Sequence, residues 1–154
     1  MMDDVTFLTK VRELLSDPER WTQHTSARNS NYEPCDTRIG RQFCWTGACY
    51  RVLFDDDPAL FNDTRIETTH EMCAKITRVF GPVSTCANYG EHGEYVVIAE
   101  MVFVNDHQGY RRVMDLIEKA LVIARSARGV VDLRPLLAAV EDAPLERGRP
   151  MAPA

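Results

Sequence analysis

Apolar residues recur every three or four positions in four stretches of the chain, which is the pattern of amphipathic helices. The first repeat follows Asp3 and Asp4, which suit a helix N-terminus, and ends before Asp17-Pro18. The third begins with a capping-box pattern at residues 64–67 and stops at Gly81-Pro82. The four repeats cover residues 7–15, 43–54, 66–80 and 110–124.

The last long repeat is preceded by Asp106, and it ends at Arg128-Gly129. An aspartate carboxylate accepts hydrogen bonds from the free N–H groups of a first helical turn, so Asp106 is predicted to be the N-cap of this helix. Asp132 is predicted to cap a short further helix whose apolar residues are Leu136, Leu137 and Val140.

Residues 94–104, EYVVIAEMVFV, form a valine-rich run without helical spacing. This composition favours a β-strand, although a nearly continuous apolar run also fits a buried helix. Gly90 and Gly93 could form the turn of a hairpin that starts near Val83. The pattern therefore predicts an α-rich α+β fold, in which about four amphipathic helices pack with a small β element, either a hairpin or a short sheet.

The length of 154 residues fits a single domain, predicted to span residues 1–142. Residues 143–154 contain three prolines and little to bury, so they are predicted to be a disordered C-terminal tail. Residues 19–40 show no sustained period and are predicted to be a long polar loop, anchored to the core by Trp21 and Tyr32.

Composition excludes several classes of function. A formal net charge of −5 points away from sequence-independent nucleic-acid binding, which needs a dense basic surface. No apolar run approaches the roughly 20 residues of a membrane span, and the acidic start lacks a signal-peptide pattern, so a cytoplasmic protein is expected. Its five cysteines are then expected to be free thiols. None of them forms a tight C-x2-C pair, and neither a metal nor a cofactor is expected.

Three short motifs resemble a family of small bacterial and phage proteins of unknown function. They are Trp21 after the first helix, FCWTGA at residues 43–48, and Val104-Asn105-Asp106 before the last long helix. The resemblance covers most of the chain. It implies that these residues matter, but it implies no particular chemistry, because the family has no assigned activity.

Cys44 allows two opposite interpretations. Beside Gly47 and Ala48, it fits a small apolar residue at a close helix contact. Alternatively, a cysteine at a helix N-terminus can be a nucleophile. Cys44, His92 as base and Asn105 as orienting residue then follow the Cys-His-Asn order of papain-like enzymes, with Gln42 as an oxyanion donor. That alternative is a cysteine-dependent hydrolase or transferase.

A third interpretation is a binding module that uses the polar loop and the glycine-rich turn. Its candidate binding residues are Trp21, Arg38, Arg41 and Asp106. The two arginines could meet a phosphate at the following helix, or Arg38 could simply pair with Asp36. We therefore expect a small cytoplasmic accessory or regulatory binding protein of bacterial or phage origin, non-catalytic, that contacts a protein or a small ligand. Cys44 is then expected to be buried, protonated and unreactive.

Overall fold

The computed structural model describes residues 2–61, 65–85 and 93–128, and this part of the chain forms an α-rich α+β fold. Its α-helices are α1 (Asp4–Leu15), α2 (Trp45–Asp56), α3 (Arg65–Phe80), α4 (Gly93–His107) and α5 (Tyr110–Ala127). Short 3-10 turns lie at η1 (Pro18–Arg20), η2 (Pro58–Phe61) and η3 (Gly81–Val83). The strands are β1 (Ala27–Arg28) and β2 (Gln42–Phe43). The predicted fold class is confirmed.

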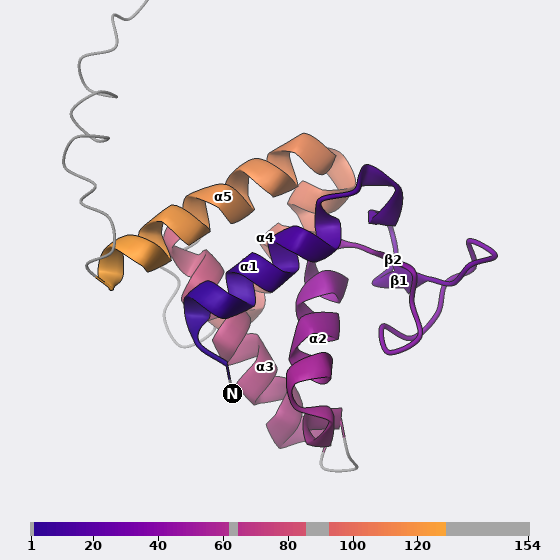
Figure 1. The fold of residues 1–154 in the computed structure, drawn as a ribbon, viewed down its shortest axis with the longest axis horizontal. Helices are drawn as coiled ribbons and strands as arrows, with labels where there is room; N and C mark the ends of the chain where they lie inside the picture. The colour runs from indigo at the N-terminus through magenta and orange to yellow at the C-terminus, as the bar shows by residue number, and fades with distance from the viewer. Residues whose placement is uncertain (1, 62–64, 86–92, 129–154) are drawn as a thin grey trace, which may run out of the picture.

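Helix α1 packs against both α5 and α2, α3 packs against α4, and α5 also contacts α3 and α4. In Figure 1, α5 runs above α1, and α2 and α3 run below it. The strands β1 and β2 pair antiparallel, with Ala27 opposite Phe43 and Arg28 opposite Gln42. They close a loop that extends from the helices at the right of Figure 1. The β element therefore comes from the polar loop, and not from a hairpin starting near Val83, where η3 lies.

The strand prediction for residues 94–104 is wrong, because these residues belong to helix α4. The inner face of α4 is buried in the core through Val97, Met101 and Val104. Its outer face is also apolar, and it leaves Tyr95 and Phe103 exposed. Apolar residues on both faces hide the helical period, so composition alone pointed to a strand.

The prediction that Asp106 caps the last helix is also wrong, for the same reason. Asp106 lies in the last turn of α4, and α5 begins only at Tyr110. The N-cap of α5 is Gly109, which has no side chain to accept a hydrogen bond and whose φ of 86° is a left-handed conformation that favours glycine.

The other helices begin and end close to their predicted positions. The Asp3 carboxylate caps α1 by accepting a hydrogen bond from the Thr6 amide at 2.9 Å. The glycine turn around residue 90, the short helix after Asp132, the tail at 143–154 and the domain boundary at 142 lie outside the described residues. Within the described segments, no helix is both long and apolar enough to cross a membrane.

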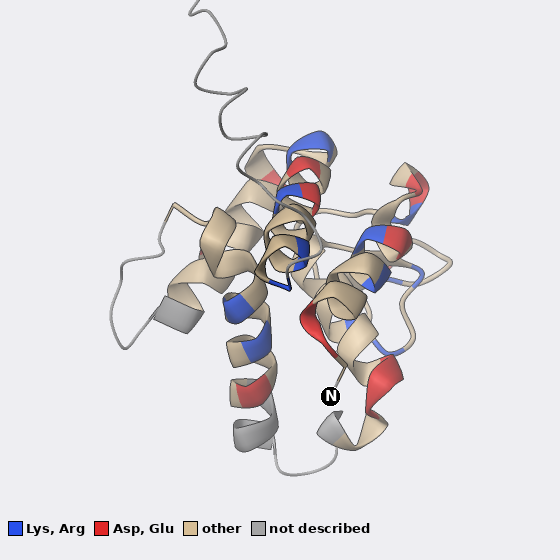
Figure 2. Ribbon diagram, turned by 60° about the vertical axis from the view of Figure 1, so that its left-hand side comes forward, with Lys and Arg blue, Asp and Glu red and all other residues tan. Residues whose placement is uncertain are grey.

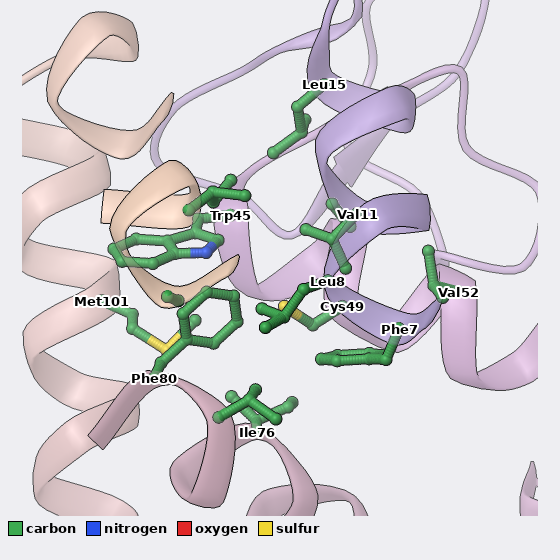
Figure 3. Packing of buried hydrophobic residues seen from close by; sticks show 14 of the residues in the cluster. Phe7, Leu8, Val11, Leu15, Trp45, Cys49, Val52, Ile76, Phe80 and Met101 are labelled. Carbon is green, nitrogen blue, oxygen red and sulfur yellow. The ribbon is translucent and has the colours of Figure 1, made fainter. Parts of the chain in front are cut away.

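The core lies where the five α-helices meet, with buried residues from each of them. Figure 3 shows the Trp45 indole beside Phe80 and Met101. The Trp45 and Phe80 rings meet edge to face, with centroids 5.0 Å apart and planes at 80°, a favourable arrangement for aromatic rings. Trp45 is the first residue of α2, so the core is directly adjacent to Cys44, the N-cap that the sequence singled out.

One charged side chain, Lys75, is buried against this core at 2% exposure. Its Nζ lies 2.6 Å from the Asp4 carboxylate and also donates to the Met2 carbonyl oxygen. Hydrogen bonds from Arg78 and Lys75 lower the pKa of Asp4 to about 2. The pair joins the start of α1 to α3 and satisfies a charge that would otherwise be costly to bury.

Candidate functional site

Asn105 is the centre of a buried hydrogen-bond network that joins three distant parts of the chain. It is fully buried, in the last turn of α4. Its Oδ1 accepts from Trp21 Nε1 at 2.7 Å and from the Trp45 backbone N–H at 2.9 Å. Its Nδ2 donates to the Thr22 carbonyl oxygen and to Asp106 Oδ1, both at 3.0 Å. Both the oxygen and the NH2 group of the amide are therefore fully used.

The same network closes the N-terminus of α2. The first N–H groups of a helix have no partner within the helix. Here the Asn105 side-chain oxygen accepts a hydrogen bond from the Trp45 N–H. Cys44 is the N-cap, and its sulfur accepts a hydrogen bond from the Gly47 N–H at 3.3 Å. The Cys44 sulfur also lies 3.2 Å from the Thr46 hydroxyl. Cys44 thus functions as a capping residue, with sulfur in place of the usual side-chain oxygen.

Gly47 lies where the backbone of the polar loop touches α2. A Cβ built on Gly47 would lie 1.9 Å from the Ser26 carbonyl oxygen. That carbonyl accepts the Cys44 N–H at 3.1 Å, so the loop is held against the first turn of the helix. This close backbone contact is the kind that the sequence predicted at Cys44, Gly47 and Ala48, and it leaves no room for a side chain at position 47.

Asp106 holds the same stretch of the loop at His24, two residues before Ser26. Its Oδ1 accepts the His24 backbone N–H at 2.9 Å, and its Oδ2 lies 3.6 Å from His24 Nδ1. Gln23 Nε2 donates to the carbonyl oxygens of Asn105 and Asp106 at 3.1 Å each. Burial raises the pKa of Asp106, but hydrogen bonds from the His24 amide and the Asn105 side chain outweigh it, so the pKa lies below its ordinary value.

The Cys44 thiol is buried, with 6% of the residue exposed. Burial raises its pKa, and hydrogen bonds from Thr46 and Gly47 offset only part of the increase. A reactive cysteine needs both a lowered pKa and access to solvent. Gln42, the candidate oxyanion donor, instead donates its side-chain N–H to the Glu19 carbonyl oxygen at 2.8 Å. These contacts are those of a structural residue.

Three of the predicted site residues meet in this network, Trp21, Asn105 and Asp106, and a fourth, Cys44, precedes Trp45 and caps the same helix end. Trp21 also packs against Tyr110, with ring centroids 5.8 Å apart. His92, the candidate base, lies outside the described residues. Among the residues that are described, no group of three or more His, Cys, Asp or Glu side chains is placed to hold a metal ion.

Arg38 and Arg41 lie apart from this network, on the exposed loop. Arg38 forms an ion pair with Asp36, at 2.7 Å between Nη2 and Oδ2. Hydrogen bonds from Arg38 lower the pKa of Asp36. The first turn of α2 is buried and filled by Asn105 and Cys44, so a phosphate at this helix N-terminus has no room.

A small crevice between α2, α4 and α5 is lined in part by Trp45, Glu100 and Leu116. Within the described residues, Trp45 Nε1 is buried without a hydrogen-bond partner. The crevice has a cavity volume of about 10 Å³, which leaves room for about one water molecule. It suits a single bound water, and it is too small for a metabolite.

Sequence reasoning missed Thr22, Gln23 and His24, which carry the loop side of the network. They stand in a stretch without periodicity. Thr22 and His24 use their own backbone atoms, and the Gln23 side chain donates to the backbone carbonyl oxygens of Asn105 and Asp106. No residue type is diagnostic for a backbone partner. His24 even adopts a left-handed φ of 65°, which is uncommon for a residue other than glycine. The neighbouring Trp21 was the one indication in the sequence of a polar contact here, because a buried indole N–H needs a hydrogen-bond acceptor.

No protein-family model matches the chain, and neither a curated protein nor a solved structure shows significant similarity to it. The likeness to small bacterial and phage proteins therefore stays a prediction. The role of the Asn105 network has to be argued from its contacts.

Proposed function

We propose that this chain is a small accessory or regulatory binding protein without catalytic activity, and that residues 29–41, the projecting loop, contact a protein partner. The observation that supports the proposal is that the polar groups of the Asn105 network form hydrogen bonds within the chain itself. Cys44, Asn105 and Asp106 bind other parts of the same chain. Their contacts position the segment that leads into the projecting loop.

The first half of the projecting loop is held by its own hydrogen bonds. Asn29 Oδ1 accepts from the amides of Asn31 and Glu33, at 2.9 and 3.1 Å. Arg28 Nη1 donates to the Tyr32 carbonyl oxygen at 2.8 Å. Tyr32 has a left-handed φ of 64° and a side chain that is exposed, at 69% for the residue, so it is not the core anchor that the sequence predicted.

The second half of the projecting loop is held by contacts within the loop and by one contact from helix α2. Asp36 accepts from the Arg38 amide at 2.8 Å and pairs with its guanidinium. Arg51, on α2, donates to the Arg38 carbonyl oxygen. This frame leaves Ile39 68% exposed. A loop that is already ordered loses less conformational entropy when it binds, which favours affinity.

A protein partner fits this surface better than a small ligand or a nucleic acid. The projecting loop extends away from the helices in Figure 1. Its two large apolar side chains, Tyr32 and Ile39, are exposed. Small ligands are usually held in concave pockets. The charges around the loop are mixed and the whole chain carries −5, which disfavours nucleic acid. Exposed aromatic residues are frequent anchors of protein interfaces.

The proposed location is the cytoplasm of a bacterium or of a phage-infected cell. The four cysteines in the described residues are free thiols: Cys35, Cys44, Cys49 and Cys73. Free thiols are typical of a reducing compartment. The bacterial or phage origin rests on the resemblance of the Trp21, FCWTGA and Asn-Asp motifs alone.

Replacing both Tyr32 and Ile39 by alanine is expected to abolish partner binding without changing the melting temperature, because both side chains are exposed. The measurement is affinity capture from bacterial lysate with chemical cross-linking and mass spectrometry. The specific prediction is a cross-link from the projecting loop to one recurrent protein, with a loss of at least about tenfold in the double variant.

The matched control is Tyr95→Ala, which removes an equally exposed aromatic side chain from α4. It is expected to retain the captured protein. If the double variant binds as well as the native chain, or if Tyr95→Ala alone abolishes capture, the projecting loop is not the binding surface.

A further inference from the structure

Helix α4 has an apolar outer face that the described part of the chain leaves uncovered. Tyr95 is 64% exposed, Phe103 55% and Val102 42%. Ala99 is also exposed and lies between the two aromatic residues. Glu100 is the only charged residue between positions 95 and 105, and its carboxylate is held by Ser84 and Thr85. In Figure 2, α4 lies at the left edge of the molecule and is almost entirely tan.

The outer face is symmetric about its smallest residue. Tyr95 and Phe103 each lie four positions from Ala99, and Val96 and Val102 each lie three positions from it. Residues three and four positions apart share one face of a helix. When two such helices meet antiparallel with Ala99 at the centre, Tyr95 of one lies opposite Phe103 of the other, and Val96 lies opposite Val102.

We propose that this face, named here the α4 face (Tyr95, Val96, Ala99, Val102, Phe103), binds the α4 face of a second copy of the chain as an antiparallel pair with Ala99 on the two-fold axis. A two-fold dimer requires one surface to be complementary to itself, and this sequence order meets that requirement. The methyl group of Ala99 allows the helix axes to approach closely. No charged side chain of the α4 face would oppose its own copy.

The area available determines how strong such a dimer can be. At 64% and 55% exposure, Tyr95 and Phe103 each leave roughly 100 Å² open to solvent. Four such rings contribute about 400 Å² in the dimer, well under the roughly 1,200 Å² of a standard stable interface. Even with the valines and Ala99 added, the dimer is expected to be weak and to form only at high protein concentration.

Cysteine cross-linking of the full-length chain tests both the partner and its orientation. The background carries Cys35→Ser and Cys86→Ser, because Cys35 is partly exposed and Cys86 lies outside the described residues; Cys44, Cys49 and Cys73 are buried. Ala99→Cys is expected to form a disulfide-linked dimer under mild oxidation. Tyr95→Cys mixed with Phe103→Cys is expected to link as well. Tyr95→Cys alone is not, because its two copies would lie about 12 Å apart along the helices.

Sedimentation velocity adds a second readout. Phe103→Glu is expected to abolish concentration-dependent association at an unchanged melting temperature, while Gln108→Glu, at an exposed site near the end of α4, leaves association intact. Two results would overturn the proposal. One is a monomer at every concentration together with no Ala99→Cys cross-link, as for a face that binds a different protein. The other is a Phe103→Glu variant with a lowered melting temperature, as for a face covered by residues 129–154 of its own chain.

Discussion

Replacing Gly47 by alanine is expected to destabilise the protein by about 3 kcal/mol, within the upper range for overpacking a core. A Cβ at this position would lie 1.9 Å from the Ser26 carbonyl oxygen, which is backbone and cannot rotate away. The loop must then move off α2, and the hydrogen bond from Cys44 N–H to Ser26 is lost. The expected drop in melting temperature is roughly 6 to 12 °C. Calorimetry or thermal circular dichroism measures it.

The direction of this effect is informative because glycine to alanine in a helix is normally stabilising, by about 0.5 to 1 kcal/mol. Gly81→Ala is the matched control, since a Cβ at Gly81 meets no atom within 4 Å. Gly81→Ala is expected to change stability by no more than about 0.5 kcal/mol. A Gly47→Ala variant as stable as the native chain would show that the loop does not lie against α2.

Asn105→Ala is expected to cost about 3 to 5 kcal/mol, because several polar groups lose their partner at once. The Trp45 N–H, Trp21 Nε1 and the Thr22 carbonyl oxygen are left unpaired, and Trp45 is only 2% exposed. Asn31→Ala, at an exposed position of the projecting loop, is the control and is expected to be nearly neutral. Urea denaturation followed by tryptophan fluorescence measures both.

Asn105→Asp separates the hydrogen bonds from the shape of the side chain. The introduced carboxyl keeps both acceptor contacts but is buried beside Asp106, so its folded-state pKa is raised above the unfolded value of about 4. The penalty is therefore small while the carboxyl is protonated in both states, and it grows as the pH rises above about 4. The stability gap to the native chain should be wider at pH 8 than at pH 4. A gap independent of pH, or a neutral Asn105→Ala, contradicts a central role for this residue.

Four helices could be predicted from the sequence because each has one apolar and one polar face. The repeat in α1, from Phe7 to Leu15, matches its buried residues. The repeat in α5 likewise matches the buried face of Val113, Ile117 and Leu121. In each case the spacing of apolar residues is set by the single face that meets the core, so the local pattern carries the tertiary information.

Helix α4 could not be predicted in this way, because both its buried face and its exposed face are apolar. Val97 and Met101 meet the core, whereas Tyr95 and Phe103 face outward with equally apolar side chains. The error then extended to Asp106, which was taken as the start of the next helix when it lies in the last turn of α4. An unrecognised apolar surface was thus the source of both wrong predictions.

Only some residues of the Asn105 network could be singled out from the sequence, and their structural role could not. Trp21 was singled out as a loop anchor and through the resemblance, and Asp106 as a helix cap. Cys44 and Asn105 were singled out as candidate catalytic residues. The structure places Trp21, Asn105 and Asp106 in one hydrogen-bond network, and Cys44 caps the adjoining helix. Their role depends on hydrogen bonds between residues 60 to 84 positions apart, such as Asn105 to Trp45 and to Trp21. Many of the partners are backbone atoms, for which residue type carries no signal. Two residues of the Cys-His-Asn order, Cys44 and Asn105, serve here as a helix cap and as the centre of the network, and the third, His92, lies outside the described residues.

The most direct test of the claim that this network is structural is the rate at which iodoacetamide modifies Cys44, measured by mass spectrometry of its peptide from pH 6 to 9. The account predicts slow modification under native conditions, a rate that falls further as the pH is lowered, and a large acceleration in denaturant. Cys35, which is partly exposed, reports the reactivity of an accessible thiol in the same sample. Fast alkylation of Cys44 that persists unchanged down to about pH 6 would indicate an exposed thiolate with a depressed pKa, and would contradict the account.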